Sequence, residues 1–204
     1  MQLIGMLDSP YVRRTAISLR LLNIPFEHRA ISVFRTFEQF RHINPVVKAP
    51  TLICDDDTIL MDSTLIIDHA ESVAGRSLMP TDRGERLCAL RVVGLALAAC
   101  EKAIQIVYER TLRPAEKQHE PWVTRVQTQL VAAVAALERE QANNRLICDQ
   151  RTINQAGITT AVAWRFIQMM LPNLVAASEY PMLAAYCAEA ESLPVFKAVP
   201  PEEP

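Results

Sequence analysis

The sequence predicts a small α/β domain followed by an all-helical domain. Strand-like runs occur only before residue 62, and beyond Gly75 the apolar residues recur at helical spacing. The 204 residues include only five glycines, which favours a helix-rich protein because strand-and-turn architectures need more residues that adopt positive φ. This length accommodates one large domain or two small ones, so a two-part chain is reasonable.

The α/β part is expected to run in the order β-α-β, short helix, β-β-α. Short apolar runs indicate the strands, and apolar residues three or four positions apart indicate the helices. Three consecutive aspartates, Asp55 to Asp57, separate the last two strands and favour a tight turn between them. The expected elements cover residues 2–7, 11–22, 26–33, 36–43, 51–54, 58–61 and 63–74.

The helical part follows a linker at residues 79–82 that ends in helix-starting chemistry. A long first helix has one face marked by Leu87, Leu90, Gly94, Leu97, Ile104 and Tyr108. A second helix has a face marked by Trp122, Val126, Leu130, Val134 and Leu137. A third helix begins near Asn154 and is stopped by Leu171-Pro172, and a fourth is expected over 181–192. The tail, residues 199–204, is expected to be extended or frayed.

The composition excludes several classes of protein. Half of the residues are apolar, and 21 Lys+Arg against 23 Asp+Glu leave a net charge of −2, as in an ordinary soluble globular protein. Such a balance argues against a nucleic-acid partner, which normally selects a basic surface. The first eight residues lack a basic segment and do not resemble a secretory signal, and the longest apolar runs, 92–100 and 130–137, are too short to span a membrane. We therefore expect a cytoplasmic protein without membrane contact.

The cysteines and histidines form no recognisable ligand pattern. The five cysteines, an odd number, are widely spaced and include no C-x-x-C pair, so we expect reduced, mostly buried thiols. The four histidines are scattered without metal-ligand spacing, so no metal site is expected.

The first candidate for chemistry is Ser9-Pro10, between the first strand and the first helix. Serine is a favoured N-cap and proline a favoured first helical residue, so the simplest interpretation is a helix start. The functional interpretation is that the Ser9 hydroxyl, beside the positive end of the helix, stabilises an anion there.

Two further motifs follow along the chain. The bond between Ala49 and Pro50 precedes a strand; if it is cis, it turns the chain sharply and leaves the N–H and C=O of Ala49 free to pair with an extended ligand. The alternative is a trans proline that opens an edge strand.

Asp62-Ser63 precedes a helix, with Ser63 as its candidate N-cap. One interpretation is that these residues only cap the helix. The other is that they also bind an α-amino-acid headgroup, in which case Asp62 receives the ammonium and Ser63 receives the carboxylate.

These three motifs, in this order on this pattern of elements, resemble the soluble glutathione transferases over essentially the whole chain. The resemblance is to bacterial members that use serine, and it implies a thioredoxin-like glutathione-binding domain at residues 1–78 and an all-helical domain at 83–204. Its glutathione motifs correspond to the segments Ser9-Pro10-Tyr11-Val12-Arg13-Arg14, Asn44-Pro45 through Lys48-Ala49-Pro50-Thr51-Leu52, and Asp62-Ser63 followed by Ile66.

The resemblance also implies roles. Ser9 would donate to the sulfur of glutathione, the co-substrate, and the thiolate would attack a small hydrophobic electrophile in cytoplasmic detoxification. Lys48 would bind the glycyl carboxylate. The backbone of Ala49, before Pro50, would pair with the cysteinyl part, and Asp62 with Ser63 would hold the γ-glutamyl end. A homodimer is implied, in which the long helices pack about a two-fold axis. The helical domain would help to bind the electrophile, for which the candidate lining residues are Tyr11, Phe34, Tyr108 and Trp164, although helical aromatics more often belong to a core.

Two alternatives stay open at this stage. The protein could bind glutathione as a carrier or regulatory partner with little catalysis, or act as a glutathione-dependent peroxidase or thiol oxidoreductase. The oxidoreductase reaction needs a nucleophilic cysteine near the first helix, whereas Cys54 lies in the expected hairpin. Conjugation, peroxide reduction, dehalogenation, ether cleavage and isomerisation are all compatible with these residues.

Two other segments carry specific expectations. Arg13-Arg14 is expected to lie on a solvated helix face, with Arg13 able to favour an anion near Ser9. Asn154 to Ile158 resembles the family's capping segment, but Gly157 stands where the family has an acid. The missing half of the capping box and the poor helix propensity of glycine should cost about 1 kcal/mol.

Overall fold

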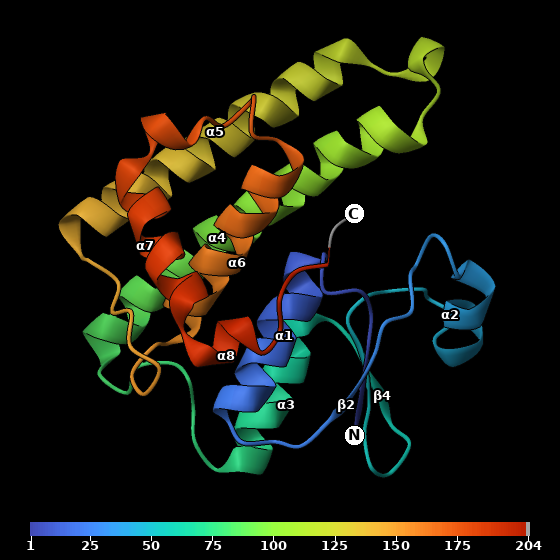
Figure 1. The fold of residues 1–204 in the computed structure, drawn as a ribbon, viewed down its shortest axis with the longest axis vertical. Helices are drawn as coiled ribbons and strands as arrows, with labels where there is room; N and C mark the ends of the chain where they lie inside the picture. Colours follow the sequence, from blue (N-terminus) through green and yellow to red (C-terminus); the bar gives the residue numbers. More distant parts are fainter. Residues whose placement is uncertain (203–204) are drawn as a thin grey trace. The chain divides into compact units, whose positions relative to one another are not determined.

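The computed structural model describes residues 1–202, and its contacts divide the chain into two units. The first unit comprises Met1–Leu78 together with the chain from Ser192 onward, and the second is Met79–Glu191 (Figure 1). The sequence assigns the residues after 191 to the helical domain, whereas their contacts group them with the α/β unit.

The first unit is built on a four-stranded mixed sheet with the order β2-β1-β3-β4. β1 is parallel to β2 and antiparallel to β3, and β3 is antiparallel to β4. The strands are shorter than the apolar runs that predict them. The first strand ends at Ile4, because Gly5, with φ 139°, turns the chain away from the sheet. The strands are β1 (Gln2–Ile4), β2 (Glu27–Arg29), β3 (Thr51–Ile53) and β4 (Ile59–Leu60). The predicted thioredoxin-like α/β domain is confirmed.

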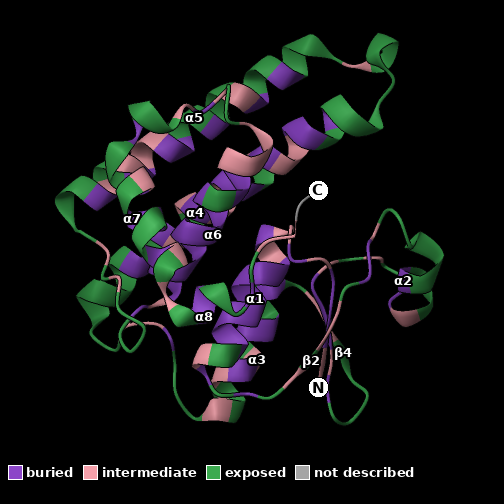
Figure 2. Cartoon of the chain, viewed as in Figure 1, coloured by how far each residue is buried: buried purple, intermediate pink, exposed green. Residues whose placement is uncertain are grey.

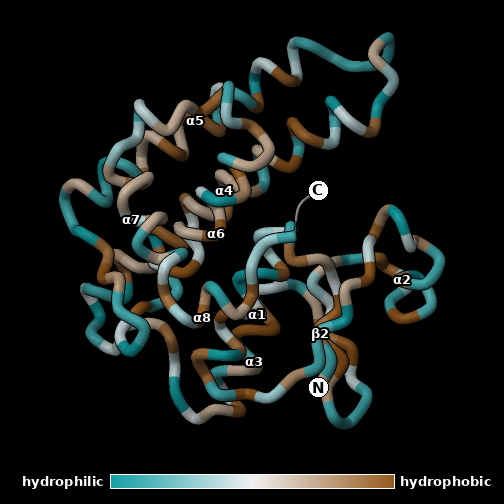
Figure 3. The backbone as a smooth tube through the Cα atoms, viewed as in Figure 1, coloured by the Kyte–Doolittle hydropathy of each residue, from teal (hydrophilic) through white to brown (hydrophobic). Residues whose placement is uncertain are grey.

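Helices cover this sheet. α1 (Pro10–Leu21) packs beside α3 (Ser63–Ala74), and α8 (Pro194–Lys197) also contacts α1 (Figure 1). α2 (Phe37–Ile43) contributes Phe40 to a buried cluster with Ile4 of β1. Figure 3 shows hydrophobic residues gathered along the strands that these helices cover.

The two arginines at the start of α1 are buried, so the prediction of a solvated face is wrong. Arg13 Nε donates to the carbonyl of Val199 at 2.9 Å, and the guanidinium lies 5.6 Å from the ring centroid of Phe196. Arg14 Nη1 donates to Ser63 Oγ at 3.1 Å. The chain after Ser192 covers this side of α1, an arrangement that helical periodicity alone does not reveal. Residues 200–202 have no regular structure, as expected of the tail; residues 203 and 204 lie outside the described residues.

The second unit is helical, as predicted. α4 packs against both α5 and α6, and the residues of α6 are buried along most of its length (Figure 2). The α-helices are α4 (Arg83–Leu112), α5 (Glu120–Asn143), α6 (Gln155–Met170) and α7 (Pro181–Ser192), and the 3₁₀ helices are η1 (Ala115–Lys117) and η2 (Ala177–Glu179).

The inward face of α4 differs from the stripe that the sequence marks. The buried positions are mostly small residues, among them Ala96, Ala99 and Ala103, which allow neighbouring helices to approach closely. Leu87 and Leu90 of the predicted stripe are instead 69% and 51% exposed. α4 therefore has two apolar faces, and only the alanine face is covered within this unit.

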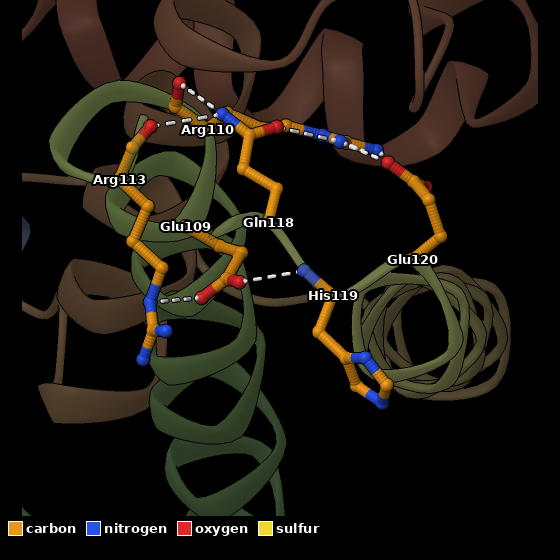
Figure 4. A network of polar contacts seen from close by, with 6 residues as sticks. All are labelled: Glu109, Arg110, Arg113, Gln118, His119 and Glu120. Carbon is orange, nitrogen blue, oxygen red and sulfur yellow. Dashed lines mark hydrogen bonds and ion pairs between the residues drawn. The ribbon is translucent and has the colours of Figure 1, made fainter. Parts of the chain in front are cut away.

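A polar network joins the end of α4 to the start of α5 (Figure 4). Arg110 pairs with Glu120 and donates to Gln118 Oε1, while the buried Glu109 accepts from Arg113 and from the backbone N–H of His119. The Glu109 carboxylate thus satisfies an amide at the start of α5, where helix N–H groups lack partners within the helix. We infer that this network stabilises the connection between α4 and α5.

The N-terminus of α6 has only half of a capping box, with Asn154 as the N-cap and Gly157 in place of the acid. Asn154 Oδ1 accepts from the N–H groups of Ala156 and Gly157 at 3.0 and 3.2 Å, so the predicted cap is confirmed. A Cβ added to Gly157 would overlap the hydroxyl of Tyr186 and approach Ile153 Cγ1 to 3.0 Å. Gly157 therefore leaves room for a buried tyrosine from α7.

Candidate functional site

Ser9 lies where β1 gives way to α1 and occupies the N-cap position of that helix. Its backbone has the extended conformation of an N-cap, but its hydroxyl accepts no bond from the helix amides. The side chain is half-buried, and within residues 1–202 no hydrogen bond occupies its Oγ. The hydroxyl is thus available to a ligand at the positive end of α1, which favours the functional interpretation of Ser9-Pro10 over simple capping.

Asp8 directly precedes Ser9 and belongs to none of the three motifs. Burial raises the pKa of its carboxyl, a hydrogen bond from the Ser9 N–H opposes this, and the charge of Glu202 raises the pKa further. Glu202 belongs to the chain that returns to this unit, and its Oε1 accepts from the N–H of Leu7 at 3.4 Å. The only sequence signal for Asp8 is its position directly before the serine.

The raised pKa of Asp8 predicts a pH-dependent stability. A carboxyl whose pKa is raised by folding favours the folded state when protonated, and this contribution is lost as the pH rises through the folded pKa. We expect Asp8→Asn to raise the melting temperature relative to wild type at about pH 7, with the difference shrinking as the pH falls toward the ordinary pKa of 3.8. Thermal denaturation at several pH values measures this, with the exposed Asp68→Asn as control. A difference that does not change with pH would contradict the assignment.

The second motif forms a loop with a cis bond between Ala49 and Pro50. Pro50 is buried, Ala49 is half-buried and Lys48 is exposed. The hydrogen bonds of the described chain include none to the N–H or C=O of Ala49. The loop thus offers both backbone groups of Ala49 to an extended ligand, as the sequence predicts for a cis bond.

The third motif begins α3. Asp62, and not Ser63 as the sequence suggests, is the N-cap, and its Oδ1 accepts from the N–H of Thr64 at 2.8 Å. The Asp62 side chain is exposed, and the peptide bond before it is cis. Ser63 is buried, and its Oγ accepts from Arg14 at 3.1 Å, which leaves its own O–H available to donate. An exposed carboxylate and a hydroxyl donor therefore lie side by side at a helix start.

Strand pairing brings the first two motifs together at one end of the two central strands, β1 and β3. β1 and β3 are antiparallel with Ile4 opposite Thr51, so the chain leaving β1 meets the chain entering β3. A Cβ added to Gly5 would lie 3.3 Å from Ala49 Cβ. The bond from Arg14 to Ser63 connects the third motif to α1. All three motifs are therefore held by one unit of the structure.

The four aromatic residues predicted for the electrophile pocket are divided between the units. Tyr11 lies in the first turn of α1, and Phe34 is exposed in the turn before α2. Tyr108 is exposed on α4, whereas Trp164 of α6 is buried in an edge-to-face contact with Tyr180, with centroids 6.1 Å apart. The core interpretation fits Trp164, and the role of the four residues in one pocket stays a prediction.

The cysteines give little support to thiol oxidoreduction. Cys54 lies after β3, and its pKa is raised by burial and by the neighbouring carboxylates of Asp56 and Asp55. Burial likewise raises the pKa of Cys148 to about 11. A raised pKa reduces the thiolate fraction that such a reaction needs.

Across residues 1–202, no group of three His, Cys, Asp or Glu residues is placed to hold a metal ion. In the same part of the chain, no helix is long and apolar enough to cross a membrane.

Comparisons with known proteins agree on one family. The glutathione S-transferase N-terminal domain family matches residues 3–77, which include all three motifs. An uncharacterised GST-like protein from Escherichia coli, YibF, is 27% identical over 164 residues, which are 80% of each chain.

Solved structures extend the similarity to both units. A glutathione transferase family member from Pseudomonas fluorescens, solved with bound S-(propanoic acid)-glutathione, is 27% identical with a TM-score of 0.84, covering 99% of this chain and 100% of the other. A glutathione S-transferase from Methylobacterium radiotolerans, in complex with glutathione sulfonate, shares the fold with a TM-score of 0.88 at 23% identity, covering 100% of this chain and 96% of that one.

Proposed function

Since the chain belongs to the glutathione transferase family, we propose that it binds glutathione and activates its thiol as a thiolate for attack on a hydrophobic electrophile. The observation that carries this proposal is the Ser9 hydroxyl, half-buried at the start of α1 and not used to cap the helix. The Pseudomonas fluorescens relative, solved with a glutathione conjugate, supports the choice of ligand.

The energetics of activation are adequate without a metal or a catalytic base. A free thiol with a pKa of about 8.5 is only a few per cent thiolate at pH 7. A hydrogen bond to an ionised group contributes about 1.5–3 kcal/mol and a helix N-terminus about 0.3–1 kcal/mol, while one pKa unit corresponds to about 1.4 kcal/mol. Ser9 and α1 would therefore lower the pKa of the bound thiol by about one to three units. The thiol proton leaves to solvent, and the thiolate then forms the S–C bond as the leaving group departs or the electrophilic ring opens.

The other contacts follow from the tripeptide's own groups. The free N–H and C=O of Ala49, before the cis Pro50, would pair with the cysteinyl backbone, and the exposed Lys48 ammonium would meet the glycyl carboxylate. At the start of α3, the Asp62 carboxylate would receive the γ-glutamyl ammonium and the Ser63 hydroxyl its carboxylate. Each proposed contact joins groups of complementary charge or hydrogen-bonding type.

We also propose a homodimer. Leu87 and Leu90 form an exposed apolar stripe on α4, opposite the alanine face that the second unit buries. Exposed apolar stripes of this kind are typical of protein interfaces. The pairing of two equivalent helices about a two-fold axis would cover them.

Binding and turnover are tested separately. We expect calorimetry to show binding of glutathione, and binding at least about tenfold weaker of cysteinylglycine, which lacks the γ-glutamyl group that Asp62 and Ser63 would hold. A panel of aryl halides, epoxides and peroxides then measures transfer or reduction. Equal binding of the two peptides, or no binding of glutathione, would contradict the proposal.

A second candidate function is a glutathione carrier or regulatory protein with little catalysis. The neighbouring carboxylates of Asp8 and Glu202 favour it, because negative charge beside Ser9 opposes formation of a thiolate. Binding of glutathione without turnover on any member of the panel would support the carrier.

A further inference from the structure

A buried hydrogen-bond relay lies beneath the cis-proline loop. Asn44 follows α2 and Thr51 begins β3; Asn44 is 2% exposed and Thr51 is fully buried. Asn44 Nδ2 donates to Thr51 Oγ1 at 2.8 Å, and Thr51 Oγ1 donates to the carbonyl of Lys48 at 2.6 Å. A hydroxyl carries a single proton, so its donation to Lys48 requires that Asn44 be the donor on the other side.

The orientation of the Asn44 amide is determined by its surroundings. Its Oδ1 accepts from the N–H of Val46 at 3.0 Å, and its Nδ2 also donates to Met61 Sδ at 3.3 Å. With the amide reversed, an NH₂ group would face the Val46 N–H, two donors in opposition. One side chain therefore ties together the beginning of the loop, the start of β3 and the residue before Asp62.

The relay fixes the direction of one backbone group at the surface. The carbonyl of Lys48 and the N–H of Ala49 belong to the same planar peptide. This peptide is trans, and the cis bond of the loop is the next one, between Ala49 and Pro50. In a trans peptide these two groups point in opposite directions. Because Thr51 draws the Lys48 carbonyl into the interior, the Ala49 N–H is directed away from it, toward the partly exposed side of the loop.

We propose that Asn44 and Thr51 are positioning residues of the glutathione site, holding the Ala49 N–H in the direction in which it binds the cysteinyl backbone. This inference rests on the proposed function, because it assigns the relay a ligand that Ala49 would contact. Neither side chain touches the ligand itself. Their effect is preorganisation, so it falls on affinity for the tripeptide and not on activation of the sulfur by Ser9.

Thr51→Val tests the relay, with Thr51→Ser as the matched control that keeps the hydroxyl. Losing one oriented hydrogen bond is expected to weaken binding of S-methylglutathione about 3- to 10-fold in Thr51→Val and less than about twofold in Thr51→Ser, measured by calorimetry. Asn44→Asp should act like Thr51→Val, since a carboxylate takes the Thr51 proton and releases the Lys48 carbonyl. In both weakened variants KM for glutathione should rise while kcat at saturating glutathione stays within about twofold.

The wild-type protein provides a measurement that does not depend on the folding of any variant. Addition of S-methylglutathione should shift the Ala49 amide resonance in the nitrogen–proton correlation spectrum and slow its hydrogen exchange, as expected for a new hydrogen bond. Unchanged Ala49 signals in a protein that binds S-methylglutathione, or equal affinity of wild type and Thr51→Val, would overturn the relay alone. No binding of S-methylglutathione by wild type would overturn the proposed function and the relay with it.

Discussion

Replacement of Ser9 by alanine is expected to lower kcat/KM at pH 7 by about 10- to 100-fold. The removed hydrogen bond to the thiolate corresponds to about 1.5–3 kcal/mol, and 1.4 kcal/mol corresponds to a factor of ten in rate. The Ser9 hydroxyl makes no hydrogen bond within the described chain, so its removal should cost the folded protein little stability. Steady-state kinetics with one accepted electrophile measures the effect, and thermal denaturation checks the fold.

The pH profile separates this role of Ser9 from a general loss of binding. In Ser9→Ala the rate should recover as the pH rises and free thiolate forms, so the variant and wild type converge at alkaline pH. Ser178→Ala, which removes an exposed hydroxyl in the second unit, is the control and should match wild type throughout. A variant that loses the same factor at every pH would show that Ser9 acts on something other than ionisation of the thiol.

The second large effect is on stability. Gly157→Asp, which restores the acid of the family's capping box, is expected to destabilise the protein by about 3 kcal/mol or more. Its Cβ would overlap the Tyr186 hydroxyl, overpacking costs about 1–3 kcal/mol, and the carboxylate would be buried. Gly157→Ala should also destabilise, although alanine has the higher helix propensity by about 1 kcal/mol. Chemical denaturation measures both.

A double-mutant cycle identifies Tyr186 as the cause. Within residues 1–202 the buried Tyr186 Oη has no hydrogen-bond partner, so Tyr186→Phe alone should be neutral or stabilising. In that background Gly157→Ala should lose most of its penalty, because the overlapping atom is gone. Additive effects of the two substitutions would contradict a direct clash.

The elements that the sequence predicted most closely carry strong local stop or start signals. The helix expected at 63–74 is α3 to the residue, because Gly75 ends it with φ 63°, a conformation that glycine adopts readily. The fourth expected helix matches α7, which begins at Pro181. The three candidate motifs also lie where the sequence places them, at the starts of α1, β3 and α3.

The features that the sequence did not reveal depend on contacts between distant segments. The burial of Arg13 results from Phe196 and Val199, more than 180 residues away. The relay of Asn44 and Thr51 depends on a loop that returns, and the hydroxyl of Tyr186 explains Gly157 only once α7 lies on α6. Helical and strand periodicity describe one element at a time and carry no signal for such contacts.

The central claim is that the first unit holds glutathione as a thiolate near neutral pH, with Ser9 as its activator. The ultraviolet absorption of the thiolate, followed during a pH titration of glutathione bound to wild type and to Ser9→Ala, tests it directly. We expect the wild-type complex to ionise about one to three pH units below free glutathione, and the Ser9→Ala complex to ionise at a higher pH than wild type. Titration of both complexes at the same pH would contradict the claim.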